Sequence, residues 1–490
     1  MKLIIESDVS EYYVQTLCLI FFPGSKFKVD EVVTEETPVV RVVTKDIDDS
    51  IYAYVTITVG DTTTEGEHTE HIRASREKAL KISVGKALFI AGEKYSGYTP
   101  HWGIMTGIRP SKISRELYQS GLSEAQVRKV LRNEYFLNPK KASLLTSVSV
   151  NEAKIIRNIK PHTCSLYISI PFCPTRCAYC SFVSFSTKRL LSLIPEYLER
   201  LIKDMDRVFS LIKSAGLTLS TVYIGGGTPT TLTAEQLSMI FDKIDSFVDV
   251  STLEEFTLEA GRPDTITKEK LELAVSRGVT RVSINPQTLN DAVLEGIGRK
   301  HTVEDFYKAF DIAREAGVKY INTDLIAGLP GDSYRSFSKT VDAILKLRPE
   351  NITIHTFSIK KAADIASSGQ SVYSITGGEA FKSVDYSQLK AKLAGYLPYY
   401  IYRQKNTVGN LENVGFSLPG AEGLYNIYIM EELTHIFAVG AGSVTKLVDR
   451  DIPKIERVFM PKYPYEYLKM TDEDIEKQYE SKVRAFFEEQ

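Results

Sequence analysis

An alternation of short apolar runs with longer amphipathic segments, between residues 163 and 360, limits the fold of this chain more than any other feature. Strands that follow one another through helices form a parallel sheet, because a parallel neighbour needs a crossover connection. Six such units, fewer than the eight of a closed barrel, predict an α/β fold with a partial (β/α)6 TIM-like barrel. In such barrels, chemistry gathers at the C-terminal ends of the strands. The expected strands are 166–170, 221–224, 255–259, 281–285, 320–325 and 351–357, and the expected helices are 195–214, 234–247, 268–277, 303–316 and 336–347.

The sequence on either side of the barrel follows other patterns. Short apolar runs at 2–6, 39–44 and 51–59 open the chain, the last of which alternates in the period-2 way of a half-buried strand, and a helical stretch at 73–84 with solvent-facing charges follows them. From 110 to about 159 the pattern is helical, with Ser111, Ser123 and Asn138 as helix-start signals and charges that are expected to face solvent. After the barrel, a Ser-, Gly- and Ala-rich segment at 360–378 predicts a loop, and a helix is expected at 387–397. The expected domains are an N-terminal α+β domain at 1–100, a helical bridge at 101–162, the barrel at 163–360 and a C-terminal α+β region at 361–490 that covers the substrate.

Three of the five cysteines fall within eight residues, as Cys173, Cys177 and Cys180, directly after the first barrel strand. The odd, sparse count argues against a disulfide framework. Soft thiolates select iron–sulfur clusters, zinc or copper(I), and structural zinc takes four ligands, for which no second cysteine pair is present. Three thiolates on one loop suit one 4Fe–4S cluster whose fourth iron is open to a small molecule. Cys18 and Cys164 are expected to be small buried residues or free thiols.

Charge and hydropathy indicate the partners and the compartment. A formal net charge of −2 gives no electrostatic reason to expect nucleic acid or an anionic membrane as the main partner. The apolar stretch at 17–22 is far too short to span a bilayer, and it lacks the basic flank of a signal peptide. We therefore expect a cytoplasmic monomer with no transmembrane segment.

Polar groups recur where successive barrel strands end. The glycine run 225–230 follows the second strand, and Glu259, Gln287 and Asp324 follow the third, fourth and fifth. Strand interiors in a parallel sheet are mostly apolar, so polar residues repeated at one end predict a ligand site. Each residue taken alone is also consistent with an ordinary loop cap.

These motifs together resemble a known family. The CxxxCxxC spacing is similar to that of radical S-adenosylmethionine (SAM) proteins, and the chain resembles their oxygen-independent coproporphyrinogen III oxidase (dehydrogenase) group. Segments outside the barrel extend the likeness to the HemZ-type branch of that group. The resemblance rests on 167–173, the cysteine triplet, 225–230, 281–287, 297–302 and 324–330 in the barrel, and on 102–110, 402–406 and 409–415 outside it.

The resemblance implies a role for each matching residue. The three cysteines would bind the cluster, and no catalytic residue is implied beyond the cluster and SAM site. Arg299 would lie near the SAM carboxylate and Asp324 near its ribose hydroxyls, which suits a guanidinium fork and an acidic acceptor. The implied cluster ligands are Cys173, Cys177 and Cys180, and the implied SAM contacts are Tyr167, Phe182 (adenine), Gly226, Gly227 and Thr228 (methionine part), Glu259, Gln287, Arg299 and Asp324.

The implied reaction acts on a tetrapyrrole. An external reductant such as flavodoxin or ferredoxin would deliver an electron to the cluster, and cleavage of SAM would give a 5′-deoxyadenosyl radical. The radical would remove hydrogen from propionate side chains, and loss of carbon dioxide and an electron would convert coproporphyrinogen III to protoporphyrinogen IX. By residue type, the candidates to meet the substrate carboxylates are Arg262, Lys300, Arg403 and Lys405, although the preferred interpretation of each is an ordinary solvated charge.

Other functions stay open at this point. No further cysteine follows Cys180 closely, and the His-Asn-x-x-Tyr-Trp text of the related haem-chaperone branch is absent from the C-terminal half. The alternatives are a haem-binding chaperone, a methyl-transferring or ring-opening tetrapyrrole enzyme, and a structural zinc protein.

Two histidines and a tyrosine-rich run also have alternative interpretations. His355 either faces the barrel interior or haem iron, or it is a hydrogen-bonded core histidine, and the same two interpretations apply to His301. The tyrosine-rich run 396–402 either lines a tetrapyrrole pocket or packs as an aromatic strand.

Overall fold

The protein is described by a computed structural model at residues 1–27, 34–180, 184–358, 376–404, 407–449 and 454–488. Its residues fall into two compact units. The first contains Met1–Val150, Gly369–Lys382 and Ile401–Glu412, and the second contains Asn151–Ser368, Ser383–Tyr400 and Asn413–Gln490. Among the described residues, every helix falls short of the length and apolar character that a bilayer crossing requires.

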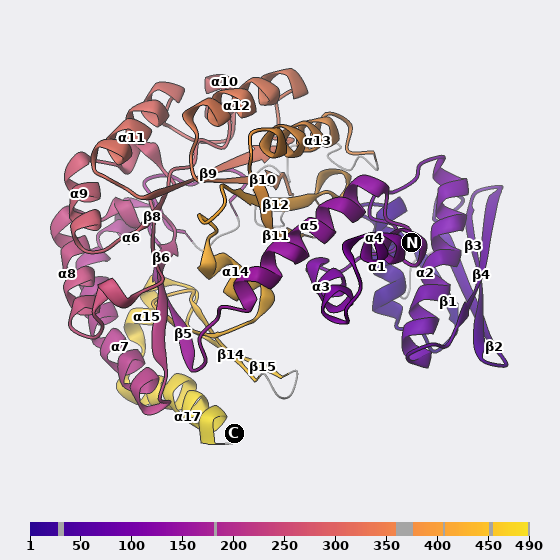
Figure 1. Cartoon of the computed structure of the whole chain (residues 1–490), viewed down its shortest axis with the longest axis horizontal. Helices are drawn as coiled ribbons and strands as arrows, with labels where there is room; N and C mark the ends of the chain where they lie inside the picture. Colours follow the sequence, from indigo (N-terminus) through magenta and orange to yellow (C-terminus); the bar gives the residue numbers. More distant parts are fainter. Residues whose placement is uncertain (28–33, 181–183, 359–375, 405–406, 450–453, 489–490) are drawn as a thin grey trace. The chain divides into compact units, whose positions relative to one another are not determined.

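The first unit begins with a four-stranded sheet in the order β1-β2-β3-β4, whose first pair is parallel and whose other pairs are antiparallel. Two helices, α1 and α2, cover one face of this sheet (Figure 1). The strands are β1 (Lys2–Glu6), β2 (Val39–Ile47), β3 (Ser50–Val59) and β4 (Thr62–His71), and the helices are α1 (Glu11–Phe21) and α2 (Arg76–Ser96). Sequence analysis predicted β1, β2, β3 and the start of α2, but not α1 or β4.

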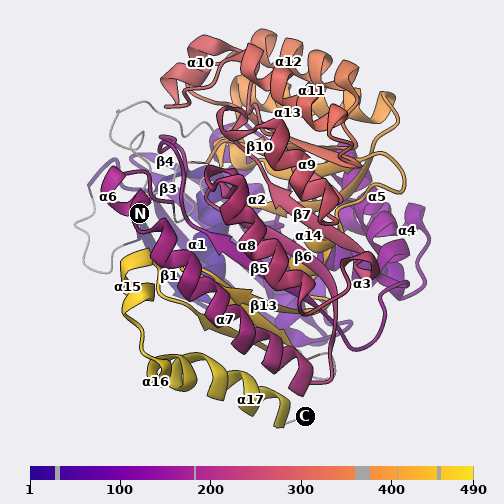
Figure 2. The ribbon, with the colours of Figure 1, turned by 90° about the vertical axis from the view of Figure 1, so that its left-hand side faces the viewer.

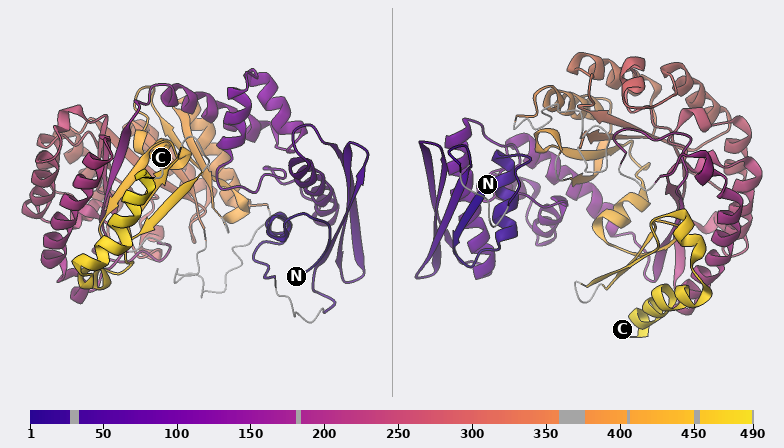
Figure 3. Two further views of the ribbon diagram at one scale, coloured as in Figure 1. Left: turned by 90° about the horizontal axis from the view of Figure 1, so that it is seen from below. Right: turned by 180° about the vertical axis from the view of Figure 1, so that it is seen from behind.

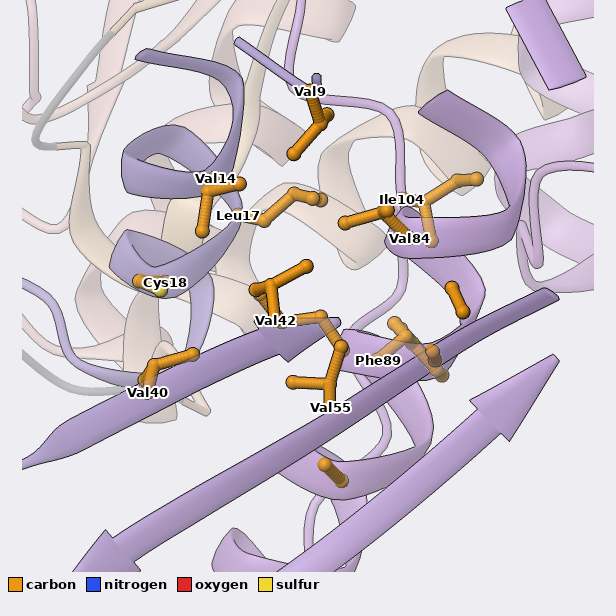
Figure 4. Packing of buried hydrophobic residues seen from close by; sticks show 14 of the residues in the cluster. Val9, Val14, Leu17, Cys18, Val40, Val42, Val55, Val84, Phe89 and Ile104 are labelled. Atoms are coloured by element: carbon orange, nitrogen blue, oxygen red, sulfur yellow. The ribbon is translucent and has the colours of Figure 1, made fainter. Parts of the chain in front are cut away.

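The core of this sheet explains both omissions. Figure 4 shows side chains of α1, among them Leu17 and Cys18, facing Val42 of β2. The apolar stretch that is too short for a membrane is therefore the buried face of a helix. Strand β4 is rich in Thr and Glu, and it packs through Gly66, where an added Cβ would lie 2.2 Å from the Ala87 carbonyl oxygen of α2. Strand β4 can approach α2 this closely because Gly66 has no side chain, and the hydropathy of the sequence does not reveal such a contact.

Three further helices follow, α3 (Ser111–Gln119), α4 (Glu124–Asn133) and α5 (Pro139–Ile156). Ser123 caps α4 in a capping box with Gln126, and the Asn138 side chain accepts a hydrogen bond from the Lys141 backbone N–H at the start of α5. Both residues were expected as helix-start signals. Lys141 itself is buried, so the expectation that the charges here face solvent is wrong at this position.

The second unit contains the predicted barrel. Six parallel strands lie next to one another in chain order, and the helices that connect them form an arc on their outer side (Figures 1 and 2). The partial (β/α)6 barrel is thus confirmed. The strands are β5 (Thr163–Ile170), β6 (Thr218–Gly226), β7 (Glu255–Glu259), β8 (Arg281–Ser283), β9 (Tyr320–Ala327) and β10 (Asn351–Thr356). The helices are α6 (Lys188–Leu191), α7 (Ile194–Ser214), α8 (Ala234–Asp245), α9 (Lys268–Ser276), α10 (Asp291–Gly296), α11 (Val303–Glu315) and α12 (Tyr334–Leu347).

The C-terminal part of the chain extends this sheet at both edges. Strand β12 pairs antiparallel with β10, and β13 pairs parallel with β5, giving the order β11-β12-β10-β9-β8-β7-β6-β5-β13-β14-β15. Helix α17 lies beside these last strands (Figure 3). The strands are β11 (Leu397–Arg403), β12 (Glu412–Ser417), β13 (His435–Val439), β14 (Val444–Val448) and β15 (Ile455–Phe459), and the helices are α13 (Gly378–Leu393), α14 (Leu424–Glu431), α15 (Pro464–Lys469), α16 (Asp472–Ile475) and α17 (Ser481–Glu488). Most of the expected loop at 360–378 lies outside the described residues.

Two motifs that lie far apart in the sequence meet in a buried network of the first unit. The Trp102 indole N–H donates to Glu412 Oε2 at 2.8 Å, and the Lys141 ammonium donates to the other oxygen of the same carboxylate. The Arg403 guanidinium lies over the Trp102 ring and donates to the Met105 carbonyl. Arg403 is buried, so its interpretation as a solvated charge is wrong.

Removing one partner of the buried Lys141–Glu412 pair should strongly destabilise the protein. We expect Lys141→Met to lower the free energy of unfolding by about 3–5 kcal/mol, because it leaves a buried carboxylate without its cation. Urea denaturation followed by fluorescence measures the loss. The double variant with Glu412→Leu should recover most of it, and Lys140→Met, at the exposed neighbouring position, should change little. Equal stability of Lys141→Met and wild type would contradict the burial of this pair.

Candidate functional site

The cysteine loop follows β5 and is held by backbone hydrogen bonds to distant segments. The Cys173 N–H donates to the Phe185 carbonyl at 3.0 Å, and the Ala178 N–H donates to the Ile297 carbonyl at 3.0 Å. Cys173 and Cys177 are buried and Cys180 is partly exposed, and all three are free thiols. The loop therefore has a fixed path that keeps three thiols together at the C-terminal end of a barrel strand.

The thiols lie among polar and cationic groups. The Cys173 sulfur is 3.3 Å from the Thr228 hydroxyl, and Nη1 of Arg262 is 3.6 Å from the Cys177 sulfur. Burial raises the pKa of the Cys173 thiol to about 11, with smaller raising contributions from Cys180 and Cys177. Bound metal reverses this preference, because a coordinating thiol is deprotonated outright. The soft donors and the neighbouring cation fit an anionic thiolate-bound cluster.

The described residues contain no group of three or more His, Cys, Asp or Glu side chains that converges to hold a single metal ion. An iron–sulfur cluster does not need such convergence, because each thiolate binds its own iron. The arrangement of the three cysteines is therefore compatible with a cluster.

The glycine run after β6 lies directly against the cysteine loop. The Gly227 N–H donates to the Ile170 carbonyl and the Thr228 N–H to the Phe172 carbonyl, both at 2.8 Å. A Cβ on Gly227 would lie 2.6 Å from the Phe172 carbonyl oxygen, and Gly226 has φ +110°. Side chains are excluded at these positions because two backbones pass so closely.

An aromatic and acidic group occupies the inner side of β5, β6 and β7. Tyr167 and Tyr223 are paired in register on neighbouring strands, and both stack on Tyr425 of α14, which lies on the side opposite the outer helices (Figure 1). The Tyr223 hydroxyl donates to Glu259 Oε1 at 2.6 Å. Burial raises the pKa of Glu259 to about 7, and Asp324 adds to this effect, although the bond from Tyr223 opposes it. Glu259 is thus a carboxyl group that titrates near neutral pH.

Asp324 lies in a denser set of hydrogen bonds on β9. The amides of Asn285 and Asn322 each donate to its carboxylate at 2.9 Å, and His355 Nε2 lies 3.6 Å from Oδ2. Burial acts to raise the pKa of Asp324, but the bonds from His355, Asn322 and Thr353 outweigh it and lower the pKa below its ordinary value. Asp324 therefore keeps a lowered pKa beside Glu259, a carboxyl group whose pKa is raised to about 7.

Gln287 joins this set through its backbone. It has φ 68°, and its N–H donates to the Asp324 carbonyl at 3.1 Å. Its own carbonyl accepts from the Ile326 N–H at 2.9 Å, so the chain beyond β8 continues the sheet. The structure thus brings Gln287 to β9 beside Asp324, as its position after the fourth strand suggested.

Arg299 is buried beside the cysteine loop. Its Nε donates to the Tyr179 hydroxyl at 3.2 Å, and its Nη1 donates to the carbonyls of Gly261 and Asn285 at 3.1 and 2.6 Å. Burial acts to lower its pKa, but Tyr179 and Cys177 outweigh it and raise the pKa. Within the described residues, no carboxylate forms an ion pair with Arg299, so this buried cation calls for an anion from outside the chain.

The remaining candidate residues differ in how deeply they are buried, and two of them lie outside the described residues. Arg262 is 3% exposed, so its interpretation as a solvated charge is wrong, whereas Lys300 is exposed. Phe182 and Lys405 lie outside the described residues. His301 is buried, and neither ring nitrogen has a hydrogen-bond partner among the described residues, so the interpretation of it as a hydrogen-bonded core histidine is wrong. Burial and the cations Arg299 and Arg262 lower the pKa of His301 to about 3.

Sequence analysis did not identify Tyr179, Tyr223, Asn285 or Tyr425 as site residues. Tyr223 lies two residues before the glycine run, on the inward face of its strand, and Asn285 ends the expected fourth strand, so their positions were readable signals. Tyr179 stood within the cysteine motif. Tyr425 belongs to a helix of the C-terminal region, and nothing in its local sequence marks it.

Comparison with known proteins places this site in a family. The family model described as the Radical SAM superfamily matches residues 167–344. The oxygen-independent coproporphyrinogen-III oxidase-like protein HemZ of Bacillus subtilis (strain 168) is 38% identical over 394 residues, which are 80% of this chain and 78% of HemZ. The heme chaperone HemW of the same organism is 36% identical over 197 residues, 40% of this chain and 51% of HemW. The structure of coproporphyrinogen III oxidase (HemN) from Escherichia coli, a radical SAM enzyme, shares the fold at a TM-score of 0.50 and 20% identity, covering 66% of this chain and 72% of HemN.

The barrel and the three-cysteine loop thus define the class of radical SAM proteins. Within that class, the chain belongs to the HemZ-type family of coproporphyrinogen oxidase-like proteins. A 4Fe–4S cluster and SAM are the cofactors of the superfamily and therefore of this chain.

The raised pKa of Glu259 predicts a pH-dependent stability. Between about pH 4.5 and 7 the folded protein holds a proton that the unfolded chain has released, so the free energy of unfolding should fall as pH rises through this window. We expect a loss of about 1–3 kcal/mol that is absent in Glu259→Gln, whose amide oxygen still accepts from Tyr223. Urea unfolding of the cluster-free protein at pH 5 and pH 8 measures it. Glu272→Gln, exposed on α9, should keep the wild-type dependence; an unchanged dependence in Glu259→Gln would refute the assignment.

Proposed function

We propose that this protein is a radical SAM oxidoreductase that decarboxylates two propionate side chains of coproporphyrinogen III to vinyl groups, without oxygen, and so forms protoporphyrinogen IX. The observation that carries the proposal is the 38% identity to a coproporphyrinogen oxidase-like protein over 80% of the chain, which takes in segments outside the barrel. The buried network of Trp102, Lys141 and Glu412 gives those outer segments a shared structure.

In this proposal Cys173, Cys177 and Cys180 bind three irons of the cluster, and SAM binds at the fourth. When bound, the two cofactors supply an electron and the 5′-deoxyadenosyl radical that removes hydrogen from the propionate. The electron comes from a flavodoxin- or ferredoxin-type reductant in the cytoplasm. The chain contributes position and exclusion of water, because two of the three thiols are buried.

The surrounding residues hold SAM. Gly226, Gly227 and Thr228 form the close backbone turn beside the cysteine loop that receives its methionine part. Asp324, kept ionised by its amide and histidine neighbours, accepts hydrogen bonds from the ribose hydroxyls. Arg299 supplies the buried positive charge for an anionic group. Tyr167 and Glu259 line the inner face next to them, and Gln287 supports Asp324 through its backbone.

A haem chaperone is the second candidate function. The match to HemW takes in 40% of this chain at 36% identity, so resemblance to the family alone does not separate the two functions. Against this candidate, the His-Asn-x-x-Tyr-Trp motif is absent from the C-terminal half of the sequence. The single tryptophan of the chain, Trp102, lies instead in a buried network of the first unit.

An anaerobic assay separates the candidates. Reconstituted, reduced protein receives SAM and coproporphyrinogen III, and chromatography quantifies 5′-deoxyadenosine and protoporphyrin IX after oxidation. We expect both products from wild type and from Cys164→Ala, whose cysteine lies buried inside β5, and neither from Cys177→Ala. Deoxyadenosine without protoporphyrin would reject the substrate, and stoichiometric haem binding without either product would favour the chaperone.

Asp324 offers a direct test of the SAM contacts. We expect Asp324→Asn to weaken SAM binding to the reconstituted protein about 10- to 100-fold, which corresponds to the loss of a charged hydrogen bond. Equilibrium dialysis with labelled SAM measures the dissociation constant. Asp342→Asn is the matched control, because Asp342 binds Tyr386 and Lys390 away from the inner face. Wild-type affinity in Asp324→Asn would remove this residue from the proposed site.

A further inference from the structure

We propose that Arg262, held in place by Asp264, is a positioning residue that raises the reduction potential of the cluster through a hydrogen bond and a positive charge at the Cys177 sulfur. The inference rests on the proposed function, because it takes Cys177 as a cluster ligand. It concerns a residue of the loop after β7 that sequence analysis assigned to substrate or solvent.

The guanidinium is divided between two partners. Nε and Nη2 of Arg262 donate to the two oxygens of Asp264 at 3.0 and 3.1 Å, which is the bidentate geometry of a strong pair. Nη1 remains, and it donates toward the Thr175 carbonyl at 3.5 Å and the Cys177 sulfur at 3.6 Å. The pair with Asp264 therefore fixes the planar guanidinium in an orientation in which Nη1 points toward the cysteine loop.

The backbone around Arg262 is itself anchored. The Thr265 N–H and hydroxyl both donate to the Arg262 carbonyl, at 3.0 and 2.8 Å. The same hydroxyl lies 2.6 Å from that of Thr230, in the loop that follows β6. The position of the guanidinium thus depends on three loops at one end of the barrel, and its 3% exposure leaves little water to screen its charge.

Arg299 is the second buried arginine near Cys177, and no carboxylate among the described residues forms an ion pair with it. It also interacts with Cys177, and it donates hydrogen bonds to the Tyr179 hydroxyl and to two backbone carbonyls. Arg262 differs in that its Nη1 lies 3.6 Å from the Cys177 sulfur while Asp264 holds the rest of its guanidinium. Because Asp264 pairs with Arg262 and not with Arg299, a change at Asp264 separates the effect of Arg262 on the cluster from that of Arg299.

Charge determines the sign of the effect. One-electron reduction adds a negative charge to the cluster, with no bond made or broken, and the electron is supplied by the external reductant. A cation and a hydrogen bond at a ligand sulfur stabilise the reduced form more than the oxidised form, so they raise the potential. Asp264 partly offsets the cation, and its neutralisation should act in the opposite direction from loss of Arg262.

The test is an EPR-monitored redox titration of the reconstituted full chain, with dithionite as reductant. Arg262→Gln should lower the equilibrium constant for cluster reduction about tenfold, a shift of about 59 mV for one electron. Asp264→Asn should shift the potential upward. Arg277→Gln is the matched control, because Arg277 pairs with Asp242 and Asp245 and contacts no cysteine, and it should titrate as wild type.

Iron and sulfide analysis accompanies each titration. An Arg262→Gln protein that holds its cluster at the wild-type potential overturns the inference. If that variant fails to hold a cluster, Asp264→Asn decides, and a potential that is unchanged or lowered there overturns the inference too. Failure of the wild-type chain to assemble any cluster would instead reject the proposed function, on which the inference rests.

Discussion

The close backbone contact between the loop after β5 and the loop after β6 is the constraint on which the candidate site depends. Parallel pairing of the two strands runs to Ile170 and Gly226, and the next donors, Gly227 and Thr228, continue it onto the cysteine loop. Because side chains would not fit between these backbones, glycine is required there. The same contact brings the Thr228 hydroxyl to the Cys173 sulfur, so the strand pairing itself places the thiol.

Further loops complete the site through contacts of the same kind. The Ile297 carbonyl holds the cysteine loop from the segment before Arg299, and the loop after β7 brings Arg262 to Cys177. Each contact joins residues that are widely separated in sequence but follow neighbouring strands. A parallel sheet makes this possible, because all its strands end at the same edge.

Sequence periodicity and sequence motifs predicted the parts of this protein that local sequence determines. The strand Glu255–Glu259 was placed to the residue, and the six barrel strands and the cysteine loop were recognised, because buried parallel strands are apolar runs and cluster ligands are rare residue types. The strands that extend the sheet were not. Strand β13 reaches β5 across most of the chain, so its partner is determined by tertiary packing that no local pattern records. Arg262 was misread for the same reason, since a buried and a solvated arginine have identical sequence neighbours.

Burial of charge gives the site its requirement for an anion. Two guanidinium groups, Arg262 and Arg299, lie buried beside the cysteine loop, and Asp264 balances one of them. His301 adds no positive charge, because burial and the two arginines lower its pKa to about 3. One uncompensated cation would be costly in this environment, whereas in the proposed site a thiolate-bound cluster and the carboxylate of SAM would supply negative charge there. In the proposed site, a chain whose overall net charge is −2 would therefore meet the cluster and the SAM carboxylate through a few buried groups and not through its overall field.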